Sequence, residues 1–234
     1  MFIYGTRYDR PCDPGNLAVM SIANLRSRAY LSAAESAFAL LGEPIVSAWW
    51  TRASVLRHFS VGGLAAHLAQ QILTVPEVLI AHTDDAPAIT LFEHYQRSGW
   101  NDADPESTVN REIRITGERA ASDGPESVLA QVHRALGIVH AELTDATAVR
   151  TVFLPWEGWS LTRDDFLLTR TVELVVHADD LAVSVGMQSP ELPGEALELV
   201  IDLLGRMAMY KHGPIAVLRA LSRTERAPET IAAI

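Results

Sequence analysis

Cysteine is nearly absent from this sequence: Cys12 is the one thiol among 234 residues. A single cysteine cannot form an intramolecular disulfide, and it also excludes every C-x-x-C motif for metal binding or redox chemistry. A chain without a disulfide framework suits the reducing interior of a cell. We therefore expect a cytoplasmic protein.

Basic residues are also scarce relative to acidic ones. The chain has 19 Lys and Arg against 29 Asp and Glu, a formal net charge of -10 and a pI near 5.2. A protein that binds nucleic acid by neutralising phosphates needs the opposite balance. We find neither a basic segment followed by an apolar run at the N-terminus nor a later charge-free stretch long enough to span a bilayer. We expect small molecules or proteins as partners, and neither nucleic acid nor a membrane.

Helix signals follow one another along most of the chain. Its hydrophobic content of 48% is enough for a substantial core in one large domain, or in one domain with an appendage. Ser60 and Thr162 are placed to cap helices, and a capping signature at Ser122 indicates the start of another helix. Pro76 should kink or end the helix that contains it. The predicted helices cover about residues 17–41, 61–76, 122–143, 163–186, 195–211 and 215–223; the segment 82–116 has no assignment.

These signals predict an all-α fold. We expect four long helices to form a bundle over residues 1–188, and a short helical C-terminal extension over residues 189–234. Strand-rich folds are disfavoured, and the segment TVFLPWEGWS before the fourth helix is expected to be a loop.

A polar line runs along the predicted fourth helix, which is otherwise almost entirely apolar. The line consists of Arg170, Glu173, His177, Asp180 and Ser184, at steps of three and four residues. Residues at this spacing share one face of a helix. Such a stripe is usually solvated, but it is also the pattern of side chains that point into a buried site.

His67 favours the second interpretation. It stands alone among Leu64, Ala65, Ala66, Leu68 and Ala69 on a different predicted helix. A lone core histidine is often satisfied by a backbone carbonyl, but helical bundles also build metal centres from residues on facing helices. His67 with Glu173 and His177 would give three ligands and leave a fourth position open.

The segments PWEGWSLTRDDFLLTRTVELVVHADDLAVSVG and FSVGGLAAHLAQ resemble the mycothiol-dependent maleylpyruvate isomerase family, one of the DinB-like metal-binding bundles. The resemblance implies that His67, Glu173 and His177 bind a divalent metal, usually zinc. The tail AVLRALSRTERAP resembles the family's C-terminal ends, where an arginine is implicated in activity; Arg219 and Arg223 are the candidates. Gly63 departs from the pattern, because relatives frequently carry an acidic residue there.

Activation of a thiol by a bound metal suits the three proposed ligands. Zinc held by two imidazoles and one carboxylate keeps a position for a thiol and lowers its pKa, so that it binds as the nucleophilic thiolate. Cys12 is then not required. Asp180 could orient the imidazole of His177. The candidates for contacting the thiol cosubstrate are Arg170, Trp156 and Trp159, although two tryptophans in a loop often simply pack on the bundle.

Three functions are compatible with these residues. The first is a metal-dependent enzyme that activates mycothiol for transfer to, or isomerisation of, a small electrophile. The second is a biosynthetic or detoxification enzyme that uses the same metal site without mycothiol. The third is a binding protein without catalysis. Metal analysis and a test of thiol dependence separate them, because only the first function needs both metal and mycothiol.

Overall fold

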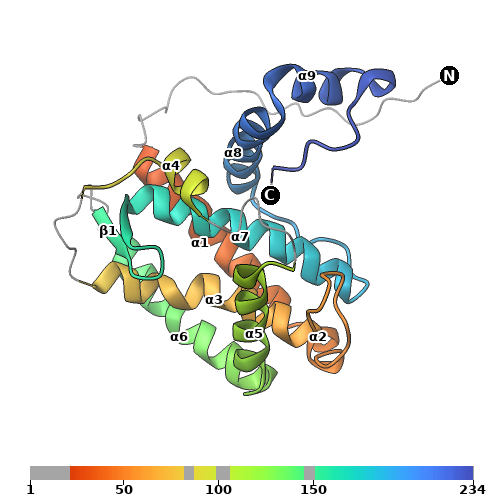
Figure 1. The fold of residues 1–234 in the computed structure, drawn as a ribbon. Coiled ribbons are helices and arrows are strands. Elements are labelled where there is room, and N and C mark those ends of the chain that lie inside the picture. Colours follow the sequence, from red (N-terminus) through yellow and green to blue (C-terminus); the bar gives the residue numbers. More distant parts are fainter. Residues whose placement is uncertain (1–21, 82–86, 99–105, 145–150, 234) are drawn as a thin grey trace, which may run out of the picture.

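Four long helices pack against one another in the computed structural model, which describes residues 22–81, 87–98, 106–144 and 151–233 (Figure 1). They are α1 (Ile22–Leu41), α3 (Val61–Ile80), α6 (Pro125–Thr144) and α7 (Arg163–Ser184). The helices α1 and α3 each contact both α6 and α7, and they also contact each other. The predicted all-α bundle is therefore confirmed. Residues 17–21, where we expected the first helix to begin, lie outside the described residues.

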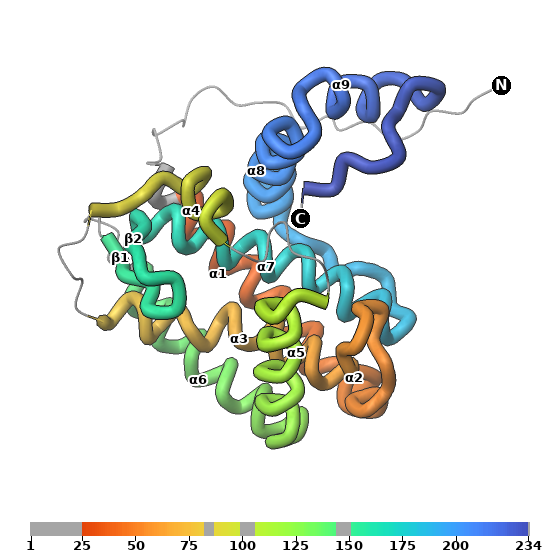
Figure 2. The backbone as a smooth tube through the Cα atoms, in the orientation of Figure 1, coloured from red at the N-terminus to blue at the C-terminus, as the bar shows by residue number. Residues whose placement is uncertain are grey.

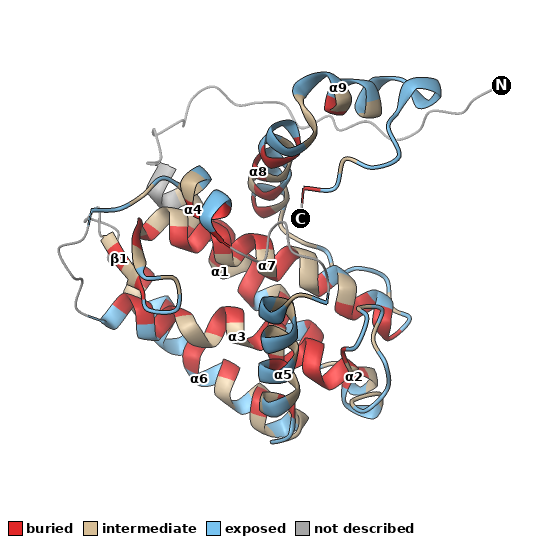
Figure 3. Ribbon diagram, in the orientation of Figure 1, coloured by how far each residue is buried: buried red, intermediate tan, exposed pale blue. Residues whose placement is uncertain are grey.

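The helix α3 is the most deeply buried element (Figure 3). Ser60 caps it as predicted, because its side chain accepts a hydrogen bond from the backbone N–H of Gly63. Pro76 does not end the helix, which continues to Ile80. Burial of nearly the whole helix outweighs the one backbone hydrogen bond that proline cannot donate.

Among the described residues, α3 is also the one helix long and apolar enough to cross a membrane by length and composition, with 67% of its apolar window buried inside the protein. The prediction concerned charge-free stretches, and Val61–Ile80 contains Glu77. The buried core helix of a soluble protein passes the same test, and here the apolar surface packs against α1, α5, α6 and α7.

A further helix, α5 (Thr108–Ala121), crosses α3 and comes from a segment for which we predicted no element (Figure 2). The crossing is close, because a Cβ on Gly117 would lie 2.8 Å from the backbone oxygen of Gly63. A short helix, α2 (Pro44–Ala48), precedes α3. Ser122 ends α5 instead of opening α6, and Gly124, with a φ of 84°, turns the chain so that Pro125 is the first residue of α6.

The segment expected to be a loop before α7 is an antiparallel hairpin of β1 (Thr151–Leu154) and β2 (Trp159–Thr162). Its last residue, Thr162, caps α7 as predicted by accepting a hydrogen bond from the backbone N–H of Asp165. The backbone N–H of Ile89 donates to the carbonyl of Ser160 at 2.9 Å. This contact attaches the start of α4 (Leu91–Arg97) to the hairpin.

The C-terminal extension consists of α8 (Gly194–His212), α9 (Pro214–Ser222) and a short 3-10 turn, η1 (Thr224–Arg226). The helix α8 packs against α7 and α1, and Arg28 forms an ion pair with Glu195. The helix α9 packs mainly against α8 and η1, away from α3 (Figure 1). The division of the chain between residues 188 and 189 stays a prediction.

Candidate metal centre

The side chains of His67, Glu173 and His177 converge between α3 and α7. Oε2 of Glu173 lies 3.3 Å from Nε2 of His177 and 3.9 Å from Nε2 of His67. The two imidazole rings meet edge to face, with their centroids 4.8 Å apart. One ligand atom from each residue lies within 4.8 Å of the other two. The structure thus brings together the three residues that the sequence singles out.

The polar line on α7 faces the protein interior, not solvent. Ser184 is buried, and Arg170, Glu173, His177 and Asp180 are partly buried. The side chains of Glu173 and His177 are only 14% and 18% exposed. Their spacing of four residues places them one helical turn apart, so both project towards α3. The solvated-stripe interpretation is therefore excluded.

The donor set fits a divalent metal such as zinc. Zinc bonds of about 2.0–2.2 Å in a tetrahedral arrangement separate the ligand atoms by about 3.4 Å. The two distances to Glu173, 3.3 and 3.9 Å, bracket that separation. Two imidazole nitrogens and one carboxylate oxygen are also the ligand types of catalytic zinc sites, which keep a further position open.

Charges within the cluster hold Glu173 ionised. Burial alone would raise the pKa of its carboxyl group, but the hydrogen bond from His177 and the positive charges of His177 and Arg170 outweigh burial and lower the pKa to about 2. Burial lowers the pKa of His67 to about 4, with a further contribution from the charge of His177. A neutral imidazole and an ionised carboxylate are the protonation states that bind metals.

Asp180 orients His177 from the opposite side. Its Oδ2 lies 3.0 Å from Nδ1 of His177, which leaves Nε2 directed at Glu173. Burial would lower the pKa of His177, but its hydrogen bonds to Asp180 and Glu173 raise it to about 9. A carboxylate on the far nitrogen of a histidine is the usual support of a metal ligand, because it fixes both the ring and the tautomer.

Arg170 ties the two ligand-bearing helices together. Its Nη1 donates to Oε1 of Gln71 at 2.6 Å, and Nε2 of Gln71 donates to the backbone oxygen of His67 at 2.9 Å. This chain of hydrogen bonds connects α7 to the turn of α3 that carries His67. Arg170 therefore lies beside the cluster, and its contact with a cosubstrate stays a prediction.

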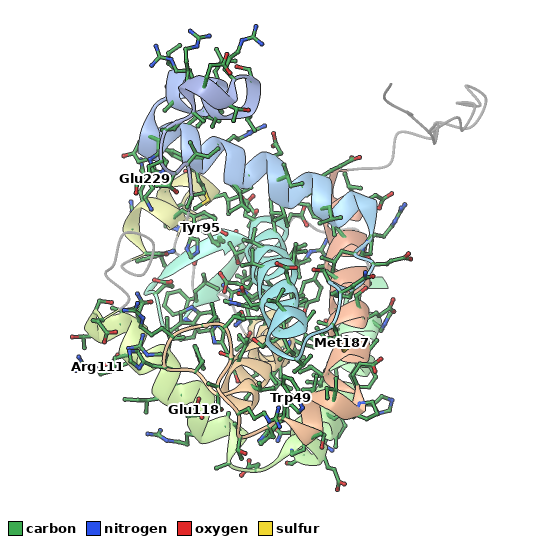
Figure 4. The ribbon with its side chains drawn as sticks, turned by 90° about the vertical axis from the view of Figure 1, so that its right-hand side faces the viewer. Trp49, Tyr95, Arg111, Glu118, Met187 and Glu229 are labelled. Carbon is green, nitrogen blue, oxygen red and sulfur yellow. The ribbon has the colours of Figure 1, made fainter. Side chains whose placement is uncertain are left out.

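Sequence reasoning missed His94, an almost fully buried histidine whose pKa is affected by the charges of Arg170 and Glu173. It lies on α4 and accepts a hydrogen bond at Nδ1 from the indole N–H of Trp159, 3.1 Å away. Its neighbour Tyr95, labelled in Figure 4, is also buried. The T-x-x-E capping box formed by Thr90 and Glu93 is the one sequence signal that could have predicted α4 and drawn attention to this histidine.

Three other predicted residues do not reach the cluster. Trp156, in the turn of the hairpin, is 51% exposed. Arg219 on α9 and Arg223 just beyond it are both exposed, and no described hydrogen bond or ion pair joins either to the ligands. The role of these two arginines came from resemblance alone and stays a prediction. Cys12 lies outside the described residues.

Comparisons with known proteins agree with this fold. Residues 31–182 match the family described as the mycothiol maleylpyruvate isomerase N-terminal domain. A crystal structure of a histidine-to-alanine mutant of the mycothiol-dependent maleylpyruvate isomerase is similar, with a TM-score of 0.50 and 14% sequence identity over 82% of this chain and 70% of that chain. No curated protein matches the sequence. The family match spans most of the chain, which therefore belongs to the mycothiol maleylpyruvate isomerase N-terminal domain family.

Proposed function

We propose that this protein is a metal-dependent thiol enzyme, which activates mycothiol as a thiolate for transfer to, or isomerisation of, a small electrophile. The observation that carries the proposal is the convergence of His67, Glu173 and His177 within 4.8 Å. Membership of the family supports the choice of thiol, since the solved relative is named as mycothiol-dependent. We propose a reducing cytoplasm as its compartment, because a chain with Cys12 as its one cysteine suits a reducing environment.

The three residues would hold a divalent ion, proposed as zinc, and such an ion lowers the pKa of a thiol that coordinates it. The protein's part is to keep the ligands in place, with Glu173 ionised and His67 neutral, whereas a bound ion would displace the proton of His177. Asp180 fixes the ring of His177, and Arg170 with Gln71 fixes the backbone at His67. The positive charge of Arg170 would also favour an anionic thiolate or substrate beside the cluster.

The test combines metal analysis with a thiol-dependence assay. Purified protein is loaded with zinc, its mycothiol affinity is measured by calorimetry, and its turnover is followed with a panel of electrophiles that includes maleylpyruvate. His177→Ala should lose both metal content and turnover, because one of three ligands is removed. Cys12→Ser is the matched control, and it should keep both.

Two results would overturn the proposal. Turnover that requires metal but is independent of mycothiol would indicate an enzyme of another class on the same bundle. Metal-loaded protein that neither binds mycothiol nor accelerates any conversion would indicate a binding protein without catalysis.

A further inference from the structure

His94 presents a hydrogen-bond donor that the proposed metal chemistry does not use. The indole N–H of Trp159 is a donor only, so Nδ1 of His94 must be the unprotonated acceptor of their 3.1 Å hydrogen bond. Any proton that the neutral ring carries is therefore on Nε2. Among the described residues, Nε2 has no hydrogen-bond partner.

The ring is neutral at physiological pH. Burial and the positive charge of Arg170 lower the pKa of His94 to about 4. Only 2% of the residue is exposed, but Nε2 is not among the described side-chain atoms that are both fully buried and without a partner, so Nε2–H keeps a small accessible surface. A donor that keeps accessible surface and has no protein partner is available to a ligand.

The hairpin fixes His94 relative to the metal ligands. Trp159 stands three residues before Thr162, the cap of α7, and α7 carries Glu173 and His177. The start of α4 is bonded to the same strand through Ile89 and Ser160. The charges of Arg170 and Glu173 both act on His94, which places the ring within electrostatic reach of the cluster.

We propose that Nε2–H of His94 donates a hydrogen bond to the substrate oxygen that becomes negatively charged during the reaction. The inference rests on the proposed function. When a thiolate adds to an α,β-unsaturated carbonyl compound, a sulfur–carbon bond forms, the carbon–carbon π bond breaks, and its electron pair moves through the conjugated system to the carbonyl oxygen. His94 keeps its proton throughout and stabilises that oxygen, assisted by the charge of Arg170. A neutral imidazole acts in this way in other enzymes.

A binding experiment tests this role without any thiol. The probe is 4-nitrophenolate, whose oxygen carries the charge of an enolate. The variant His94→Asn keeps an acceptor for Trp159 near the place of Nδ1 but removes the donor at Nε2. We expect zinc-loaded wild type to bind the phenolate at least about tenfold more tightly than the variant, with zinc affinity unchanged. Equal affinities, or no binding to wild type, would overturn the inference.

A pair of electrophiles then separates catalysis from folding. Methyl vinyl ketone has an oxygen that gains charge on addition of mycothiol, whereas benzyl chloride has no oxygen. His94→Asn should slow the first reaction by about 10²–10³-fold, as the loss of one oxyanion donor does, and leave the second unchanged. An equal loss with both electrophiles would show a structural role and overturn the inference. If wild type turns over neither, the proposed function fails, and the phenolate measurement still decides the role of His94.

The tautomer is directly observable, even if His94→Asn does not fold. Nitrogen NMR of the wild type should show a protonated Nε2 and an unprotonated Nδ1 on His94. Trp159→Phe keeps the ring packing but removes the indole donor, so a mixture of tautomers and weaker phenolate binding should appear. A wild-type spectrum with the proton on Nδ1 would contradict the proposal.

Discussion

Glu118 completes the cap of α3 from a different helix. Its Oε1 accepts from the backbone N–H of Ser60 at 2.7 Å, and its Oε2 accepts from the hydroxyl of Ser60 at 2.9 Å. In a capping box this acid stands at the third helical position, which is Gly63 here. A Cβ on Gly63 would lie 2.3 Å from Oε1 of Glu118, so glycine leaves room for this acid. Glu118 is supplied by α5 (Figure 4). The departure from the family pattern at Gly63 thus has a physical reason.

A double-mutant cycle measures this arrangement. Glu118→Ala removes the acid of a helix cap, and we expect it to lower the free energy of unfolding by about 1.5 kcal/mol. Gly63→Ala in wild type forces a methyl group against the carboxylate and Phe59, which should cost about 1–3 kcal/mol as overpacking does. Once Glu118 is shortened, only the contact with Phe59 remains. The double variant should therefore be more stable than the sum of the single losses predicts, by about 1 kcal/mol.

Urea unfolding of the four metal-free proteins, followed by circular dichroism, gives the coupling energy. The control is Glu93→Ala, which removes the acid of the local capping box on α4 and should add independently to Gly63→Ala. Losses for Gly63→Ala and Glu118→Ala that add to within about 0.5 kcal/mol would refute the reasoning, because residues in contact are expected to couple.

Three further predictions concern the site. Asp180→Asn should weaken zinc binding about 10- to 100-fold in a competition titration, and an unchanged affinity would show that His177 needs no orienting partner. His94 has its pKa lowered to about 4 from 6.5, so between these pH values the unfolded chain binds a proton that the folded chain lacks, and stability falls as pH falls. At pH 5 the loss is about 2 kcal/mol, so His94→Asn should lose less stability than wild type between pH 7 and pH 5 in urea melts. Arg219→Ala should leave zinc affinity and stability within about 0.5 kcal/mol of wild type, since the side chain is exposed on α9; a large loss of zinc affinity would place that helix at the metal centre.

Much of the bundle could be predicted from local sequence patterns. Ser60 and Thr162 are caps in both the sequence pattern and the structure, because a cap depends on residues only three positions away. The pairing of Glu173 with His177 is likewise local, as they stand one helical turn apart. His67 could be added because it stands alone among the apolar residues Leu64, Ala65, Ala66, Leu68 and Ala69. Helix periodicity therefore located the candidate ligands as well as the fold.

The elements that the sequence did not reveal depend on distant partners. The helix α5 is held by the crossing of Gly117 over Gly63, which are more than fifty positions apart. The position of His94 depends on Trp159 in the hairpin, which no local pattern links to it. Pro76 is tolerated because the packing around α3 outweighs a local penalty. Long-range packing decided each of these features.

The candidate ligands come from segments more than a hundred positions apart, since His67 is on α3 and Glu173 on α7. An ion held between them would act as a cross-link that exists only in the folded chain. At a free ion concentration about a thousand times the dissociation constant, such binding adds about 4 kcal/mol to the free energy of unfolding. A chelator would then behave as a mild denaturant, and the supply of the metal in the cell would set how much folded protein survives proteolysis, independently of any demand for its catalysis.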